Sequence, residues 1–264
     1  MADSVLVADV GNTSTAVGIY SGGRVRRRIH LATAAGAAAG CGTEIARRLG
    51  PARCHAAVLA CVVPHALKAW QRCLRGVCGS PPLVVDHRVR LEMPVAYPRP
   101  ETIGADRLAD ACGAVALYGM PVIIADFGTA LTFDVCAAGR GYVGGVIAPG
   151  LPLMFDYLAE RTALLPHIRP RRVPRAIARS TRQAMLAGAR WGYLGMVREI
   201  LRRLREELQA PGAPVCATGG YARWVLRDLD EDIPVLPDLT LYGLGRIHEI
   251  NQKAAPAAQR KGTS

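Results

Sequence analysis

The sequence is poor in aromatic residues and in lysine. Phe, Trp and Tyr make up 5% of its 264 residues, and three lysines stand beside 30 arginines. The arginines give a formal net charge of +12 and cluster at 24–28, 169–175 and 198–205. No cluster contains an aromatic side chain on which a base could stack, so the charge favours phosphorylated small molecules over nucleic acid as partners.

Long apolar runs are also missing. The most apolar segment, 121–138, contains Asp126 and Asp134, which argues against a membrane span. The first residues lack a cationic start and soon reach Asp9, a pattern that does not fit a signal peptide. Because hydrophobic residues make up 50% of the chain, we expect a globular cytoplasmic protein with one large core or two moderate ones.

Cysteine is present but sparse. The eight cysteines are scattered between positions 41 and 216, and no two are spaced as Cys-x-x-Cys. They are too dilute for a disulfide framework. The sequence therefore predicts free thiols, buried as cysteines in protein cores commonly are.

The most informative feature is an internal repeat. Residues 5–13 and 122–130 are each a short aliphatic run that ends in Ala-Asp-x-Gly. The runs predict buried strands, the Asp-x-Gly predicts a tight turn, and residues 16–20 and 131–135 predict the returning strands of two β-hairpins. Because the copies lie about one domain length apart, we expect two similar domains.

The repeated turns suit a metal-bound polyphosphate. Glycine lets backbone N–H groups approach an anion, and Asn12, Thr13 and Thr129 supply short hydrogen-bonding side chains. A carboxylate at the end of each strand, Asp9 or Asp126, can hold a hard cation directly or through water. Facing each other across a cleft, the two turns would grip a nucleotide from both sides. Ordinary Asp-Gly turns without a ligand are the alternative.

Three further segments carry candidate site residues. Residues 104–107 precede an alanine-rich helix and place Asp106 in its first turn, where the helix dipole favours an acid with or without chemistry. Thr181 follows Ser180 at the start of an amphipathic run to Leu208, and either residue could be its N-cap. Thr218 to Gly220 is a third glycine-rich turn, after a strand and before a helix that begins near Tyr221.

These motifs together resemble a known family. Five segments follow the order and spacing of type III pantothenate kinases: 9–13, 104–107, 126–130, 144–150 and 218–220. The resemblance runs from about residue 5 to Asn251. It implies an α/β, actin-like ATPase fold with two ribonuclease-H-like domains, a nucleotide cleft between them, and a homodimer. We therefore expect domains at 1–118 and 119–252, followed by a flexible tail at 253–264.

The resemblance also implies roles for individual residues. Asp106 would be the catalytic base, Asp9 would orient Mg²⁺ through water, and Asp126 would lie at a potassium or ammonium site. The residues expected to bind the phosphates of ATP are Asp9, Gly11, Asn12, Thr13 and Thr129. The residues expected at the pantothenate site are Tyr97, Gly104, Ala105, Arg107 and Thr181. The implied reaction is ATP-dependent phosphorylation of pantothenate to 4'-phosphopantothenate, the first step of coenzyme A biosynthesis.

Other functions stay open at this point. Family relatives include accessory factors for virulence-gene expression, so one alternative is a regulatory protein on the same fold. Another is a kinase for a different small hydroxyl compound. The loop before Gly104 also departs from the family, because Arg99 stands where many members have Asn before the proline. A packed tyrosine is the alternative role for Tyr97.

Overall fold

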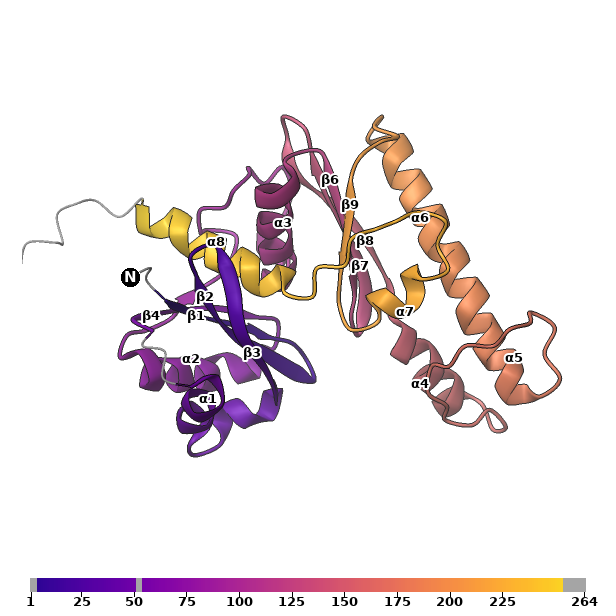
Figure 1. The fold of residues 1–264 in the computed structure, drawn as a ribbon, viewed down its shortest axis with the longest axis horizontal. Coiled ribbons are helices and arrows are strands. Elements are labelled where there is room, and N and C mark those ends of the chain that lie inside the picture. Colours follow the sequence, from indigo (N-terminus) through magenta and orange to yellow (C-terminus); the bar gives the residue numbers. More distant parts are fainter. Residues whose placement is uncertain (1–3, 51–53, 254–264) are drawn as a thin grey trace, which may run out of the picture. The chain divides into compact units, whose positions relative to one another are not determined.

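The computed structural model describes residues 4–50 and 54–253 and divides the chain into two compact units (Figure 1). The first unit combines the residues up to Leu117 with those from Asp238 onward, and the second runs from Tyr118 to Pro237. The predicted tail, 253–264, lies outside the described residues apart from Lys253. In the part of the chain that the structure describes, no helix is long and apolar enough to cross a membrane.

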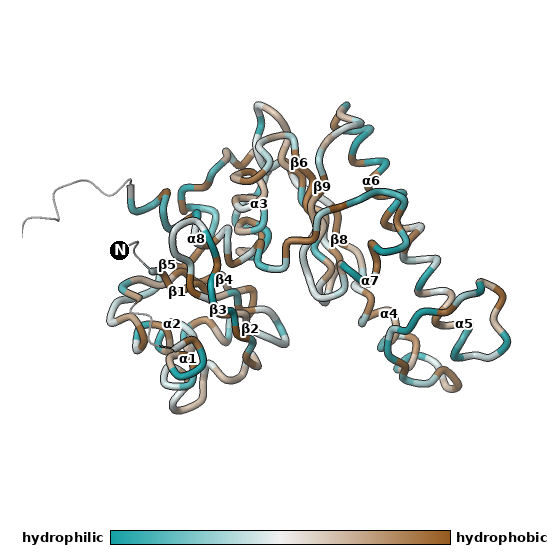
Figure 2. The backbone as a smooth tube through the Cα atoms, in the orientation of Figure 1, coloured by the Kyte–Doolittle hydropathy of each residue, from teal (hydrophilic) through white to brown (hydrophobic). Residues whose placement is uncertain are grey.

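The first unit contains a five-stranded sheet in the order β3-β2-β1-β4-β5. Its strands are β1 (Val5–Val10), β2 (Ser14–Ser21), β3 (Arg24–Ala32), β4 (Ala56–Cys61) and β5 (Leu83–Val84). β1, β2 and β3 are antiparallel, whereas β4 and β5 run parallel to β1. The apolar stretches lie in the central strands, while β3, at the edge, is hydrophilic (Figure 2).

Helices cover both faces of this sheet. On one face, α1 (Cys41–Leu49) and α2 (Pro64–Cys78) pack with the 3-10 helix η1 (Thr33–Ala37) over Leu6 and Ala8. Strand residues alternate between faces, so Val7 points to the other side. On that other face α8 (Leu239–Lys253) contacts β1 and β2, and α3 (Ala105–Tyr118) packs against α8. The short 3-10 helix η2 (Pro100–Thr102) precedes α3.

The division at the C-terminus differs from the sequence prediction, which placed residues up to 252 in the second domain. Helix α8 instead packs on the first sheet. A glycine also lets α8 pack closely against α3: a Cβ at Gly243 would lie 2.6 Å from the carbonyl carbon of Ala109 and 3.1 Å from the nitrogen of Gly113. A real side chain there would push α8 away from α3.

The second unit repeats the strand pattern of the first. Its sheet has the order β8-β7-β6-β9, from β6 (Val122–Phe127), β7 (Ala130–Ala137), β8 (Gly141–Pro149) and β9 (Val215–Thr218). β6, β7 and β8 are antiparallel and β9 runs parallel to β6, as β4 does to β1. Both predicted hairpins are therefore confirmed.

The helices of the second unit are α4 (Leu151–Arg161), α5 (Thr181–Ala187), α6 (Tyr193–Glu207) and α7 (Ala222–Leu226). A π-helical turn, η3 (Gly188–Gly192), joins α5 to α6, so the predicted amphipathic helix is present with one irregular turn. Its apolar residues, such as Val197 and Leu201, enter a core with Phe127 and Phe133.

The prediction that all cysteines are free is wrong for one pair. Cys41 and Cys73 form a disulfide, with their Cα atoms 6.0 Å apart. The pairing arises because the start of α1 packs against the third turn of α2. The other six cysteines keep their thiols, and burial raises the pKa of the Cys112 thiol to about 12.

Candidate functional site

The first predicted phosphate loop lies between β1 and β2, where Gly11, Asn12 and Thr13 form the turn. The Gly11 N–H donates to the Ser14 carbonyl oxygen at 3.1 Å and closes this turn. Asp9 is half-buried one residue before the end of β1, and the side chains of Asn12 and Thr13 are exposed. The turn therefore presents polar side chains outward from a rigid strand end.

The second predicted loop, Gly128 and Thr129, joins β6 to β7 and is one residue shorter. Its Gly128 N–H donates to the Ala130 carbonyl oxygen at 3.0 Å. The register shows the difference in length: Asp126 pairs with Thr132, six residues on, whereas Asp9 pairs with Ala16, seven residues on. The two loops are similar in position but not identical in conformation.

Two other glycines pack closely on the second loop. A Cβ at Gly150 would lie 2.6 Å from the Gly128 carbonyl oxygen and closer still to that of Thr129. Gly219, with a φ of +91°, similarly approaches Asp126 and the Phe127 backbone, and the Tyr221 N–H donates to the Phe127 carbonyl oxygen at 3.1 Å. Three loops separated in the sequence thus meet at one edge of the second sheet.

Asp106 lies in the first turn of α3, as predicted. Its carboxylate folds back over Gly104, where a Cβ would collide with Asp106 Oδ1, and it accepts a hydrogen bond from the Arg107 N–H at 2.8 Å. Burial raises the pKa of this carboxyl group, although the Arg107 N–H and the positive charge of Arg107 oppose the shift. A desolvated carboxylate of this kind can accept a proton from a hydroxyl group.

The predicted substrate residues fall into two places. Tyr97, Gly104, Ala105 and Arg107 lie in or just before α3 in the first unit, with Tyr97 and Arg107 half-buried. Thr181 is the exposed first residue of α5 in the second unit. The Gln183 N–H donates to Ser180 Oγ at 3.3 Å, so the capping role belongs to Ser180. The arrangement of Thr181 relative to Asp106 stays a prediction.

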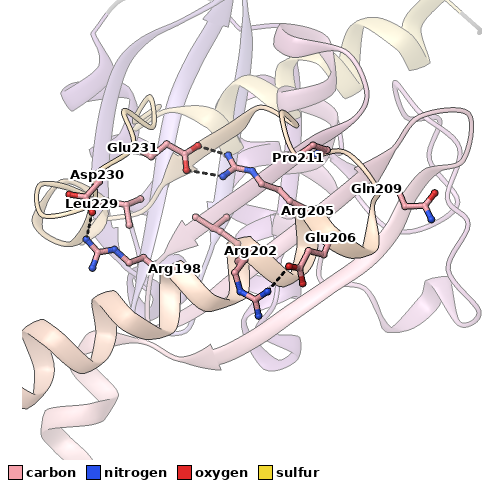
Figure 3. A pocket seen from close by; sticks show the side chains of 10 residues that line it. Arg198, Arg202, Arg205, Glu206, Gln209, Pro211, Leu229, Asp230 and Glu231 are labelled. Carbon is pink, nitrogen blue, oxygen red and sulfur yellow. Dashed lines mark hydrogen bonds and ion pairs between the residues drawn. The ribbon is translucent and has the colours of Figure 1, made fainter.

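A cavity of 630 Å³ lies beside the C-terminal half of α6, and no predicted site residue lines it. Three arginines face it, but each is paired with an acid: Arg198 with Asp230, Arg205 with Glu231, and Arg202 with Glu206 (Figure 3). The opposing charges compensate one another, so this cavity is not a cationic phosphate site.

A second cavity, of 540 Å³, is almost entirely apolar. It is lined by residues of α4, α5 and the turn between α5 and α6, among them Leu153, Tyr157, Met185 and Ala189. The side chains of Leu153 and Tyr157 are 42% and 63% exposed. Such a patch on a protein surface is typical of a site that another molecule covers.

The candidate metal ligands in this structure are single carboxylates. Within residues 4–50 and 54–253 there is no group of three or more His, Cys, Asp or Glu side chains that could hold a metal ion. Asp9 lies near Asn12 and Thr13 at the end of β1, a set of one carboxylate and neutral oxygens. That set fits Mg²⁺, which proteins commonly hold by one or two carboxylates together with substrate phosphates and water.

Several known proteins with similar sequences are type III pantothenate kinases. A family model described as type III pantothenate kinase matches residues 5–203. A type III pantothenate kinase from Akkermansia muciniphila is 47% identical over 208 residues, which are 77% of this chain and 82% of that protein. One from Thermomicrobium roseum is 37% identical over 257 residues, which are 93% of this chain and 96% of that protein.

Solved structures agree on the fold. A Baf family protein from Campylobacter jejuni superposes with a TM-score of 0.57 at 15% identity and covers 94% of this chain and 99% of its own. A ROK family glucokinase from Streptomyces griseus, solved with glucose and AMPPNP, has a TM-score of 0.51 at 14% identity and covers 95% and 99%. The predicted actin-like α/β fold is confirmed, and at these identities the likeness shows the fold alone.

Proposed function

The chain belongs to the type III pantothenate kinase family, and from this membership we propose how its residues carry out the reaction. It is a pantothenate kinase, a phosphotransferase that uses ATP to convert pantothenate to 4'-phosphopantothenate for coenzyme A biosynthesis. The observation that carries the mechanism is the Asp106 carboxylate, held in the first turn of α3 with a pKa raised by burial.

Ionised Asp106 accepts the proton of the primary hydroxyl group of pantothenate while that oxygen forms a bond to the γ-phosphorus of ATP. The bond from the γ-phosphorus to the bridging oxygen breaks, ADP leaves with that oxygen, and Asp106 later releases the proton to solvent. A raised pKa makes the carboxylate a stronger base than a solvated aspartate. Because phosphoryl transfer needs little covalent chemistry from the protein, alignment of the hydroxyl and the phosphate controls the rate.

The two strand-turn loops bind the triphosphate. The proposed contacts are Gly11, Asn12 and Thr13 in one loop and Thr129 in the other, with backbone N–H groups and short side chains as donors. Asp9 would hold Mg²⁺, which would supply positive charge against the charge that develops on the phosphates. The rigid strand ends behind both loops support this assignment.

Asp126 binds a monovalent cation, potassium or ammonium, beside the triphosphate. Its carboxylate lies next to Gly128 and Gly219, and neither glycine has a side chain to fill the space beside it. A carboxylate supplies the oxygen ligands that hard cations take in proteins. Asp126 therefore contributes negative charge to the nucleotide site.

The pantothenate site is formed by Tyr97, Gly104, Ala105, Arg107 and Thr181. Arg107 follows the base directly, and its planar guanidinium group can pair with the carboxylate of pantothenate. A side chain at position 104 would displace the Asp106 carboxylate, which occupies the space beside Gly104. Binding the carboxylate end through Arg107 would place the hydroxyl end of the substrate for attack.

We also propose a homodimer, with the apolar cavity between α4 and α5 as part of the interface. Leu153 and Tyr157 are large exposed side chains at this cavity, and a partner subunit would bury them. At Gly188, Gly192 and Gly195 on the adjoining helix, an added Cβ would have no heavy atom of the described residues within 4 Å, leaving aside the helix's own backbone. Another helix could therefore approach closely there. Cytoplasmic location stays a prediction.

The reaction is tested by incubating the purified protein with ATP, Mg²⁺, potassium and pantothenate in an assay coupled to ADP release. We expect ADP to form only when pantothenate is present, with 4'-phosphopantothenate identified by mass spectrometry. A hexose and other hydroxyl compounds serve as competing substrates, and turnover of one of them in place of pantothenate would contradict the assignment. Filter binding to DNA at physiological salt tests the regulatory alternative, for which we expect no specific binding.

A further inference from the structure

A buried hydrogen-bond network lies directly behind the first phosphate loop, residues 11–13. Its centre is Thr33, the first residue of η1, whose side chain is buried. Thr33 Oγ1 donates to the Gly11 carbonyl oxygen at 2.6 Å, and the Thr33 N–H donates to the Thr13 carbonyl oxygen at 3.1 Å. One residue thus holds both ends of the loop.

The network continues on either side of Thr33. Its single hydroxyl proton goes to Gly11, so the Thr15 hydroxyl, 3.2 Å away, is the donor to Thr33 Oγ1. Behind it, the Nε1–H of Trp70 on α2 donates to the Thr33 carbonyl oxygen at 2.9 Å. Chains of this kind strengthen each member bond in a buried setting.

Trp70 is closely packed against the backbone of η1. The indole is completely buried beneath η1, and a Cβ at Gly36 would lie 2.6 Å from its Cδ1 atom. Glycine at 36 therefore lets the ring approach the backbone closely enough to reach the Thr33 carbonyl oxygen. Helix α2 in this way fixes the position of Thr33.

The direction of the Gly11 carbonyl decides where the loop points its donors. In a trans peptide the C=O and N–H groups point in opposite directions. Because the Gly11 carbonyl points at Thr33, the Asn12 N–H of the same peptide points away from Thr33. A backbone N–H in that direction is available to an anion.

We propose that Thr33 is a positioning residue for ATP, which holds the Gly11–Thr13 loop in its binding conformation without touching the nucleotide. Trp70 supports it from α2. The proposal rests on the proposed role of this loop in phosphate binding. The hydrogen bonds of Thr33 and Trp70 described above reach the Gly11–Thr13 loop and neither Asp106 nor the proposed pantothenate residues, so we expect the effect of losing the Thr33 hydroxyl to fall on ATP.

The test compares Thr33→Val, which keeps the shape and removes the hydroxyl, with Thr33→Ser, which keeps the hydroxyl. We expect the KM for ATP of Thr33→Val to rise about tenfold, equivalent to about 1.4 kcal/mol, with kcat and the KM for pantothenate nearly unchanged. Thr33→Ser should stay within about twofold of wild type, because the bond to Gly11 is kept. Thr162→Val, which removes a hydroxyl bonded to the Leu158 carbonyl oxygen in the second unit, is the matched control.

A purely structural role would give a different pattern, because loss of folded protein lowers kcat and leaves both KM values in place. Titration with a non-hydrolysable ATP analogue provides a direct measure of binding. If Thr33→Val binds it as wild type does, or if Thr33→Ser loses as much affinity as Thr33→Val, the proposal is wrong.

A second variant covers the case in which Thr33→Val does not fold. Trp70→Phe keeps a buried ring and removes the Nε1 donor, and we expect it to weaken analogue binding about threefold. Wild-type affinity in Trp70→Phe would then overturn the proposal. Should wild type bind the analogue but phosphorylate no pantothenate, the proposed function fails while the binding series still decides the role of Thr33.

Discussion

Replacing Gly150 by alanine tests whether the Gly128–Thr129 loop positions the triphosphate. Gly150 has φ −69° and ψ 162°, which alanine adopts without strain, so the effect comes from the new methyl group alone. That methyl would lie 2.6 Å from the Gly128 carbonyl oxygen, whereas ordinary contact begins at 3.4 Å. The loop must therefore move by about 0.8 Å or more, and displacements near 1 Å can cost about 10²-fold in rate.

The assay is steady-state kinetics with ATP as the varied substrate, with circular dichroism to establish that the variant is folded. We expect kcat/KM for ATP to fall about 10²-fold and stability to fall by about 1–3 kcal/mol from overpacking. Gly212→Ala is the matched control, since its methyl would meet no atom of the described residues within 4 Å. A folded Gly150→Ala enzyme with wild-type kinetics would refute the role of this loop.

Three other predictions concern pH, redox state and the monovalent cation. Because the pKa of Asp106 is raised, its ionised form destabilises the folded protein at pH values above the ordinary aspartate pKa of 3.8. Asp106→Asn should therefore be more stable than wild type at pH 7 and should lose that advantage near pH 3. An equal difference in stability at both pH values would contradict this prediction. Cys73→Ser opens a disulfide that spans 32 residues and should lower the unfolding free energy by about 3.7 kcal/mol without reductant, and a difference that persists in dithiothreitol would count against this cause. Sodium should not replace potassium in sustaining kcat if Asp126 holds the cation, and full activity in sodium alone would remove that role.

Local patterns predicted the two hairpins and the helix that carries Asp106. Each hairpin prediction depends on an aliphatic run followed at once by Asp-x-Gly, and the prediction for Asp106 depends on the alanine-rich stretch that begins at Leu108. Such signals need only neighbouring residues, because strand, turn and helix start are determined within a few positions.

Contacts between distant segments could not be predicted in the same way. The packing of α8 against α3 depends on Gly113 and Gly243, which meet only after both helices have formed. The Cys41–Cys73 disulfide and the bond from Trp70 to Thr33 likewise join α2 to the segment around η1. A buried threonine or a small residue in a helix has many ordinary explanations, so no spacing in the sequence marks these positions.

The most direct test of the account is turnover by Asp106→Asn. The variant keeps the size of the side chain and removes the base, so we expect kcat to fall by about 10²–10⁴-fold while the affinity for the ATP analogue stays at the wild-type value. Asp232→Asn, at an exposed acid in the second unit, should retain full activity. Near-normal turnover by Asp106→Asn would contradict the mechanism.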